Sequence, residues 1–367
     1  GGLADVLGSL PKSVKKILGD GGDVRVVIPL YPSIRDKFAE QLELIYETNV
    51  WLAWRNQYCG IWRTVSDGVT FYFIDNLYYF DRKMLYGNYD DAERFAFFSK
   101  AVMEMMSMIK FYPDILHAND WQTALTVIYL KKKYGHIAEY RNIRSMFTIH
   151  NIDYQGVFDF KILGDVFELP EWEKNTVEYN GCINLLKGAV TCADKVTTVS
   201  ETYSREILTE FYSSGLHFIL RQANDEGRLT GIVNGIDVDY YNPTKDNEIA
   251  AKFSPKDLSG KAADKAANPE ETSGYRHEKR AAWLLFFSYS LLRQVRVGEG
   301  DELLQAFRAQ LHLIADFAGG KNDGVEKLGG FIEHRYEGLL HADGTAAAAD
   351  VSGQPQKILD VHHLDPL

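Results

Sequence analysis

The segment that most constrains the fold is SMFTIHNIDYQG, residues 145–156. It begins as a short apolar run and changes abruptly, at His150 and Asn151, to a polar stretch that ends in glycine. A short apolar run bounded in this way is typical of a buried strand. In a parallel α/β sheet, ligands bind just beyond the carboxyl ends of the strands. His150 and Asn151 are therefore candidate binding residues.

A second segment, DILHANDW at residues 114–121, has the same plan. Asp120 follows its strand run as His150 follows the other, so we predict that the two strand ends border one pocket. Each residue also has a structural alternative. Asp120 could be the N-cap of the helix expected from Trp121, and His150 could be a hydrogen-bonded histidine at a strand end. For His117 we expect a structural or supporting role.

The remaining segments alternate between strand-like and helix-like patterns, which predicts an α/β fold with a Rossmann-like, doubly wound parallel sheet. We expect strands at residues 24–28, 114–116, 145–149, 195–199 and 229–233, and helices at residues 91–111, 121–134, 182–192, 216–223 and after Ser200. Strand-like runs between residues 42 and 76 predict a β-rich insertion. Residues 268–367 show no such alternation, so we expect an irregular carboxyl-terminal tail.

Two glycine-containing pairs have both a functional and a structural interpretation. Gly1 and Gly2 precede an expected helix, which either continues past Pro11 or restarts there. A glycine pair in this place lets backbone N–H groups approach a phosphate at the positive end of the helix dipole, although an ordinary loop is the alternative. Asn234 and Gly235, after the last expected strand, are a turn signal.

Charge and cysteine content exclude several classes of function. The formal net charge of −11 argues against nucleic acid and anionic membranes as partners, because both require a basic face. The longest apolar run, residues 281–292, is shorter than the roughly 20 residues that span a bilayer. The three cysteines lack metal-ligand spacing and indicate reduced thiols, hence a cytoplasmic location. No G-x-G-x-x-G pattern supports a dehydrogenase.

Several segments occur in order at sensible spacing: GGLADVLGSLPK, DILHANDWQTAL, FTIHNIDYQG, EYNGCINLLKGAVTCADKVTTVSETYSREI and GRLTGIVNGIDVDYYNP. Together they resemble the amino-terminal domain of the bacterial glycogen synthase and plant starch synthase family. The resemblance implies half of a two-domain glycosyltransferase of the GT-B type. It places this domain at residues 1–242, the start of an interdomain linker at 243–267, and an unassigned tail at 268–367.

The resemblance also implies the chemistry. Such enzymes transfer glucose from ADP-glucose to the non-reducing end of an α-1,4-glucan with retention, and need neither a metal nor another cofactor. Catalytic roles fall to His150, whose carbonyl and ring would face the transferred glucose, and to Asp120 beside it. The expected substrate-binding residues are Gly1 and Gly2 at the diphosphate, Asn151 supporting the turn, and Asn234 at the sugar hydroxyls. On the acceptor side the segment YGNYDDAER suggests Tyr89 and Arg94.

The sequence also departs from the family pattern. Beyond KAADKAA, at residues 261–267, no VSRL-x-x-QKG or EPCGL segment follows, and these would neutralise the leaving group and contact the sugar. We therefore expect a truncated or misassembled gene and negligible activity for this chain. One alternative is a non-catalytic glucan-binding module. Another is a different nucleotide-sugar glycosyltransferase, such as a relative of sucrose synthase or trehalose-phosphate synthase.

Overall fold

A computed structural model describes residues 2–235, 237, 238 and 240–267. The chain divides into two compact units, residues 1–242 and 243–367. In the second unit the described part contains one helix, α11 (Ser259–Ala267). The expected irregular tail at 268–367 lies outside the described residues, as does Gly1. Everything that follows concerns the first unit.

One sheet, here called sheet A, has the strand order β1-β4-β3-β2. Its strands are β1 (Arg25–Pro29), β2 (Glu43–Leu52), β3 (Arg55–Ser66) and β4 (Val69–Asp75). β1 and β4 are parallel, and the other pairs are antiparallel. The β-rich stretch expected between residues 42 and 76 is present as β2, β3 and β4, and β4 joins it to β1.

The second sheet, sheet B, has the order β11-β10-β6-β5 and is parallel throughout. Its strands are β5 (Ile115–Asn119), β6 (Arg144–Ile149), β10 (Lys195–Thr198) and β11 (Leu229–Gly231). Four of the five strands expected from the apolar runs therefore lie here, which confirms the α/β class. The strand runs end where polar residues begin, so the functional candidates follow the carboxyl ends of the strands.

The two sheets are not joined by hydrogen bonds between described strands. β1 pairs only with β4, and β5 pairs only with β6, so each leaves one edge without a described partner strand. Among the described residues the expected Rossmann-like α/β arrangement is thus built from two four-stranded sheets, and no described strand pairs with both β1 and β5.

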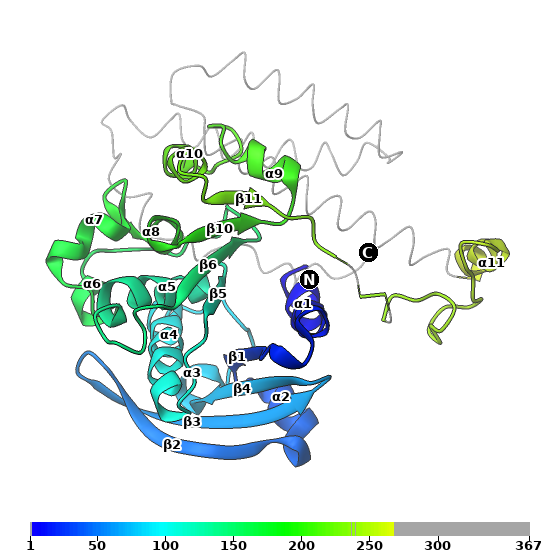
Figure 1. Cartoon of the computed structure of the whole chain (residues 1–367), viewed down its shortest axis with the longest axis horizontal. Coiled ribbons are helices and arrows are strands. Elements are labelled where there is room, and N and C mark those ends of the chain that lie inside the picture. Colours follow the sequence, from blue (N-terminus) through cyan, green and yellow to red (C-terminus); the bar gives the residue numbers. More distant parts are fainter. Residues whose placement is uncertain (1, 236, 239, 268–367) are drawn as a thin grey trace, which may run out of the picture. The chain divides into compact units, whose positions relative to one another are not determined.

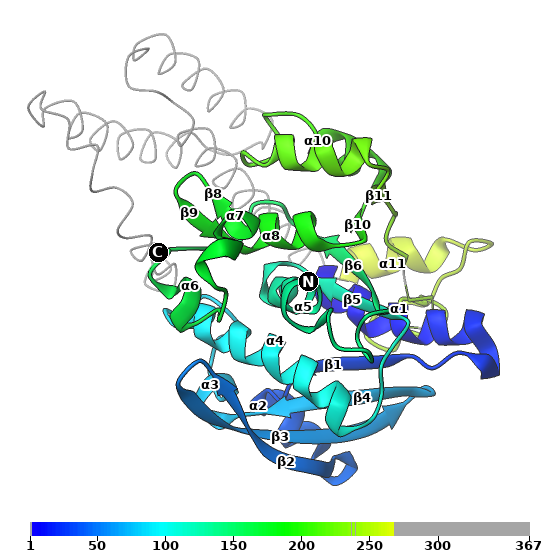
Figure 2. The ribbon, with the colours of Figure 1, turned by 60° about the vertical axis from the view of Figure 1, so that its left-hand side comes forward.

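Helices cover both sheets (Figures 1 and 2). α1 (Gly2–Leu18) continues through Pro11 without a break in the helix, and α4 (Asp91–Met108) packs on sheet A. The helix expected at 121–134 is present in three parts: η3 (Trp121–Thr123), α5 (Ala124–Tyr129) and the π-helical turn η4 (Leu130–Tyr134). α4 and α5 pack together around buried aromatic and aliphatic side chains, among them Phe97, Leu125 and Tyr129.

The helix expected at 182–192 begins later than its apolar pattern suggested. Residues Cys182–Asn184 form β9, and α8 spans Leu185–Cys192. The Asn184 side chain accepts a hydrogen bond from the backbone N–H of Lys187 and so caps α8. β9 pairs with β7 (Val157–Phe158) and β8 (Glu178–Tyr179) in a third, small sheet.

The other predicted helices are confirmed, and short elements complete the unit. α9 (Glu201–Glu206) is capped by Ser200, whose side chain accepts from the Tyr203 N–H, and α10 spans His217–Asp225. The short elements are η1 (Gly19–Gly21), α2 (Pro32–Phe38), η2 (Ala39–Gln41), α3 (Leu77–Phe80), α6 (Ile162–Asp165), η5 (Glu171–Glu173) and α7 (Lys174–Val177). Of the helices described, none is both long and apolar enough to span a bilayer.

Candidate functional site

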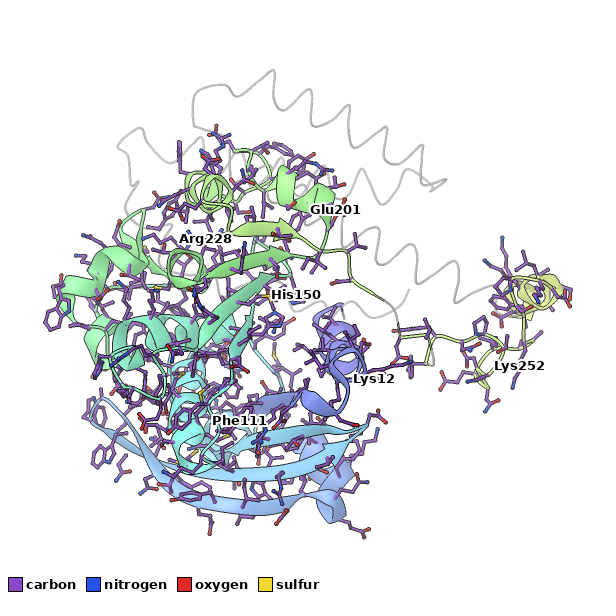
Figure 3. The ribbon with its side chains drawn as sticks, in the orientation of Figure 1. Lys12, Phe111, His150, Glu201, Arg228 and Lys252 are labelled. Carbon is purple, nitrogen blue, oxygen red and sulfur yellow. The ribbon has the colours of Figure 1, made fainter. Side chains whose placement is uncertain are left out.

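The parallel register of β5 and β6 brings Asp120 and His150 together. Asn119 lies opposite Thr148, and the Asp120 N–H donates to the Thr148 carbonyl at 3.0 Å. The Asp120 carboxylate in turn accepts the backbone N–H of His150, with an N–Oδ1 distance of 2.8 Å. Figure 3 shows His150 at the carboxyl end of β6. The two strand ends therefore form one continuous polar edge, as the sequence predicted.

Asp120 adopts a backbone conformation that is uncommon for an L-residue. Its φ is 57° and its ψ is 176°, and non-glycine residues in such regions are concentrated at functional sites. The N-cap alternative is wrong for its side chain, which makes no capping hydrogen bond to η3. The Thr123 hydroxyl instead bonds the backbone before η3, because it accepts the N–H of Asn119 at 2.6 Å. The Asp120 carboxylate accepts the backbone N–H of His150 and does not cap η3.

Burial and hydrogen bonding set the protonation of this pair. Only 9% of Asp120 is exposed, and burial raises the pKa of its carboxyl group, while the hydrogen bond from the His150 N–H lowers it. Burial lowers the pKa of the His150 imidazole from its ordinary 6.5, while the charge of Asp120 raises it. At neutral pH we therefore expect a neutral imidazole next to a carboxylate that backbone donors stabilise.

Asn119 orients the His150 ring, and sequence reasoning missed it. The side-chain oxygen of Asn119 lies 3.0 Å from His150 Nε2. Because this oxygen can only accept, the neutral ring carries its proton on Nε2 and Nδ1 remains an acceptor. The signal was present in the sequence, since Asn119 directly precedes Asp120 at the same predicted strand end.

A chain of buried polar side chains crosses sheet B beneath this edge. His117 Nε2 lies 2.6 Å from the Thr148 hydroxyl, which lies 2.6 Å from the Thr197 hydroxyl. Burial and, to a smaller extent, the neighbouring His150 lower the pKa of His117 to about 4, so its ring is neutral at pH 7. His117 thus links three strands, as expected of a supporting residue.

The loop after β6 is held by side chains from three other segments. Asn151 supports the turn, as its oxygen accepts the N–H of Asp153 at 3.0 Å. The Tyr203 hydroxyl of α9 accepts the Ile152 N–H at 3.0 Å. Gln155 accepts from the amide of Asn184 at 2.6 Å and donates to the Ser214 carbonyl at 3.0 Å. These bonds fix the position of the loop.

The other predicted substrate-binding residues lie at separate places. Gly2 is the first residue of α1, and Asn234 is exposed in the segment that follows β11. Because β11 is parallel to β10 and β10 to β6, Asn234 follows the same edge of sheet B as His150. The ligand-binding roles of Gly2 and Asn234 stay predictions.

The two predicted acceptor residues differ sharply in exposure. Tyr89 is 80% exposed, whereas Arg94 is fully buried. The Arg94 guanidinium donates to Asp91 at 2.5 Å, to the Tyr79 carbonyl at 2.6 Å and to the Leu85 carbonyl at 3.4 Å. In this position Arg94 holds the segment that carries Tyr89 in place, and its own contact with an acceptor remains a prediction.

Exposed tyrosines also gather beside the loop after β6. Tyr154 in that loop and Tyr86 in the segment before α4 are each about half exposed. Burial raises the pKa of the Tyr154 phenol, and the neighbouring Tyr86 raises it further. Aromatic rings that are exposed side by side offer flat apolar faces with a polar tip. Among the described residues, no group of His, Cys, Asp and Glu is arranged to hold a metal ion, and all three cysteines are free thiols.

Comparisons with known proteins assign the family. The family model described as "Starch synthase catalytic domain" matches residues 1–222. This chain belongs to that family. It is 45% identical over 273 residues to a glycogen synthase of Ligilactobacillus salivarius and 47% identical over 272 residues to one of Streptococcus equi subsp. equi. Each alignment covers 74% of this chain and 56% of the relative, so the chain spans about half the length of these relatives.

A solved structure supports the same assignment. The chain matches the catalytic domain of starch synthase IV from Arabidopsis thaliana, bound to ADP and acarbose, with a TM-score of 0.64 and 32% sequence identity. The match covers 73% of this chain and 55% of that one. The family resemblance drawn from the ordered segments is thus confirmed, and so is the corresponding GT-B-type, Rossmann-like fold of a glycosyltransferase domain.

Proposed function

We propose that the edge formed by Asp120 and His150 binds the glucose of ADP-glucose during its transfer, with retention, to the non-reducing end of an α-1,4-glucan. One observation carries the proposal: the Asp120 carboxylate accepts the His150 N–H at 2.8 Å, so the two strand ends share one fixed polar edge. The family supports it, because the chain is similar to glycogen synthases and to a starch synthase domain bound to ADP and acarbose.

The geometry suits the charges that this transfer creates. Breaking the bond between the sugar and the diphosphate builds positive charge on the sugar and negative charge on the leaving group. The carboxylate of Asp120 and the carbonyl of His150 are the groups at this edge that stabilise positive charge. His150 Nδ1, left as an acceptor by Asn119, can accept a hydrogen bond from a sugar hydroxyl. The positive end of the α1 dipole, at Gly2, would favour the diphosphate.

The exposed tyrosines near the loop after β6 supply an acceptor surface. Tyr86 raises the pKa of the Tyr154 phenol, and Tyr89 is 80% exposed in the same segment as Tyr86. Sugar rings can lie against such faces while their hydroxyls bond to polar tips. We propose that Arg94 acts indirectly here, by donating a hydrogen bond to the Leu85 carbonyl and so fixing the segment that carries Tyr86 and Tyr89.

The wider assignments follow from the same proposal. Residues 1–242 would serve as the acceptor-side domain, residues 243–267 would begin an interdomain linker, and ADP-glucose would act as a substrate without a metal or further cofactor. The three free thiols favour the cytoplasm.

Binding by the purified chain tests the proposal directly. We would titrate maltoheptaose and ADP-glucose separately into the 15N-labelled chain and follow backbone amide signals. Amides of the segment 119–121 and of the loop 150–156 should shift with saturation. Asp120→Asn should weaken ADP-glucose binding, whereas Asp67→Asn, at an exposed turn remote from the edge, should not. Shifts that avoid both segments, or equal affinities of the two variants, would contradict it.

Transfer activity distinguishes the second candidate, a non-catalytic glucan-binding module. The sequence contains no VSRL-x-x-QKG segment, and removal of a single preorganised donor costs about 10²–10³ in rate. We therefore expect this 367-residue chain to be retarded in glycogen-containing native gels but to incorporate almost no glucose from radiolabelled ADP-glucose. Ready incorporation would refute the expected loss of activity and exclude the binding module.

A further inference from the structure

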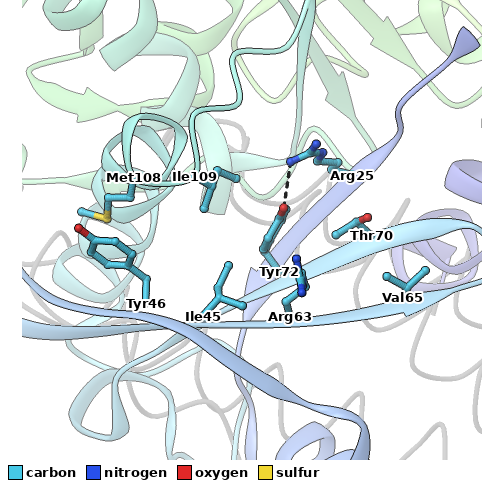
Figure 4. Close-up of a pocket in the computed structure, with 9 residues that line it drawn as sticks. All are labelled: Arg25, Ile45, Tyr46, Arg63, Val65, Thr70, Tyr72, Met108 and Ile109. Carbon is cyan, nitrogen blue, oxygen red and sulfur yellow. Dashed lines mark hydrogen bonds between the residues drawn. The ribbon is translucent and has the colours of Figure 1, made fainter.

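A hollow of about 460 Å³ lies on the face of sheet A near the end of α4 (Figure 4). Arg25 and Thr70 pair at the start of β1 and β4, so the hollow lies at the amino-terminal ends of these parallel strands. Asp120 and His150, by contrast, follow the carboxyl ends of β5 and β6. The proposed function makes no use of this hollow, which is lined by Arg25, Ile45, Tyr46, Arg63, Val65, Thr70, Tyr72, Met108 and Ile109.

Strand register places two arginines on the same face of the sheet. Arg25 lies opposite Thr70, and Arg63 lies opposite Tyr72. Thr70 and Tyr72 are two residues apart on β4, so all four side chains share one face. Figure 4 shows Arg25 and Arg63 on either side of Tyr72. The hollow therefore has two cationic walls with phenol and hydroxyl groups between them.

A change of register supplies an apolar wall. The pairing of β2 with β3 shifts between Leu44 and Tyr46, and both Ile45 and Tyr46 line the hollow. In a regular strand these neighbours would point to opposite faces, and bulges are a common way of redirecting a side chain. Met108 and Ile109, at the end of α4, complete this wall.

The Arg25 guanidinium is fixed by its neighbours and keeps N–H groups that could bind a ligand. Its guanidinium carbon lies 3.6 Å from the centre of the Phe111 ring, and Nη1 donates to the Tyr72 hydroxyl at 2.9 Å. Nε and Nη2 donate to the Asp23 carboxylate at 3.1 and 2.8 Å. A guanidinium has five N–H groups, so these three bonds to described residues leave two.

Arg63 is more exposed and has more donors left. Its Nε and Nη2 donate to Glu43 at 3.2 and 2.5 Å, and these two bonds leave three of the five N–H groups without a described acceptor. The carboxylates of Asp23 and Glu43 are 54% and 61% exposed. Ion pairs of this exposure are weak, so a ligand that binds more tightly can share or displace them.

We propose that this hollow binds a small organic phosphate, a phosphate monoester whose anionic group lies between Arg25 and Arg63. Its organic part would lie against Ile45 and Met108. Arginine is the side chain best suited to phosphate, because its planar N–H groups match two oxygens at once. The volume is within the usual range of pockets for small molecules, roughly 300–1,000 Å³. The net charge of −11 disfavours long polyanions such as nucleic acid as the occupant.

Phenyl phosphate is a suitable probe, because it combines a phosphate monoester with a compact apolar body. Titrated into the 15N-labelled chain, it should cause saturable shifts in the amides of β1, β4 and the residues that follow α4. Inorganic phosphate should bind at least threefold more weakly, and benzyl alcohol, which lacks the charge, should cause no saturable shift there. If phenyl phosphate and inorganic phosphate bind equally, the apolar wall has no part and the proposal fails.

A matched pair of variants tests the arginines. Arg63→Gln should weaken phenyl phosphate binding at least tenfold. The variant should fold as the parent chain does, because among the described residues Arg63 bonds only to Glu43. Arg35→Gln removes an equal charge from α2, outside the hollow, and should leave the affinity within twofold. Equal weakening by both variants would overturn the site. Shifts confined to the Asp120–His150 edge would also overturn it, without bearing on the proposed function.

Discussion

Substitution of Gly156 by alanine should be the most damaging single-methyl change in the loop after β6. Gly156 has a φ of +64°, and a Cβ placed there would lie 2.6 Å from Trp121 Cε3 and 2.9 Å from Cδ2. Trp121 cannot move aside easily, because its ring packs against Phe95 and Phe158 with centroid distances of 5.3 and 5.7 Å. The new methyl group therefore meets a ring that is itself fixed on both sides.

The expected cost has two parts. A non-glycine residue in the left-handed region costs about 1–2 kcal/mol. Insertion of a methyl group into a filled site costs about 1–3 kcal/mol. Gly156→Ala should therefore lower the free energy of unfolding by about 2–5 kcal/mol. Since Trp121 directly follows Asp120, part of any relaxation should also disturb the candidate site.

Two other glycines separate these parts. Gly181 has a φ of +77° with no atom within 4 Å of the added Cβ, so Gly181→Ala should show only the conformational cost of about 1–2 kcal/mol. Gly8 lies inside α1 with open space around it, and Gly8→Ala should stabilise by about 0.5–1 kcal/mol. Urea unfolding followed by circular dichroism would measure all three. If Gly156→Ala is no worse than Gly181→Ala, the close contact with Trp121 has been misjudged.

Three further predictions concern charge and hydrogen bonding. Glu168→Gln should lower the free energy of unfolding by about 3–5 kcal/mol, because it leaves Lys100, whose side chain is 8% exposed, without its carboxylate. The control Glu43→Gln, which removes the carboxylate of an exposed ion pair, should cost less than about 1 kcal/mol. Similar urea midpoints for the two variants would refute this. Because the folded chain lowers the pKa of His117 from 6.5 to about 4, the unfolded chain takes up a proton on His117 first as the pH falls. About 3 kcal/mol of stability should therefore be present above pH 6.5 and be lost towards pH 4. When unfolding is measured across this range, stability should depend less on pH in His117→Gln. Asn119→Ala should mix the two neutral tautomers of His150, whereas Asn119→Asp should keep the proton on Nε2 as in the parent chain. The 15N shifts of the His150 ring measure this, and unchanged shifts in Asn119→Ala would contradict it.

The strand ends of sheet B were predictable because their signals are local. An apolar run that stops at His150 or Asp120 indicates where the strand lies and which residues follow its carboxyl end. The parallel pairing of neighbouring strands then brings those residues together, as the hydrogen bond between them shows. The same local logic located the cap at Ser200, since a serine before a helix has a clear physical use.

Other features depend on contacts that a single sequence does not reveal. Asp120 looked like an N-cap, but Thr123 forms the local bonds and the Asp120 carboxylate turns to His150. The resemblance suggested Arg94 as an acceptor residue, and nothing in the sequence indicated that its guanidinium is buried against the Tyr79 carbonyl. The apolar run from Cys182 looked like one helix, although its first residues pair with β7 and β8. Each outcome was decided by partners distant in sequence.

The edges of β1 and β5 that have no described partner strand affect how the chain behaves at high concentration. Each presents a row of backbone donors and acceptors that no described strand satisfies, and such rows readily recruit extended segments from other molecules. Purification should therefore favour dilute solution and low temperature, and fusion to a solubilising partner should raise the yield of monomer. A peptide that adds as a strand to either edge would be expected to suppress precipitation.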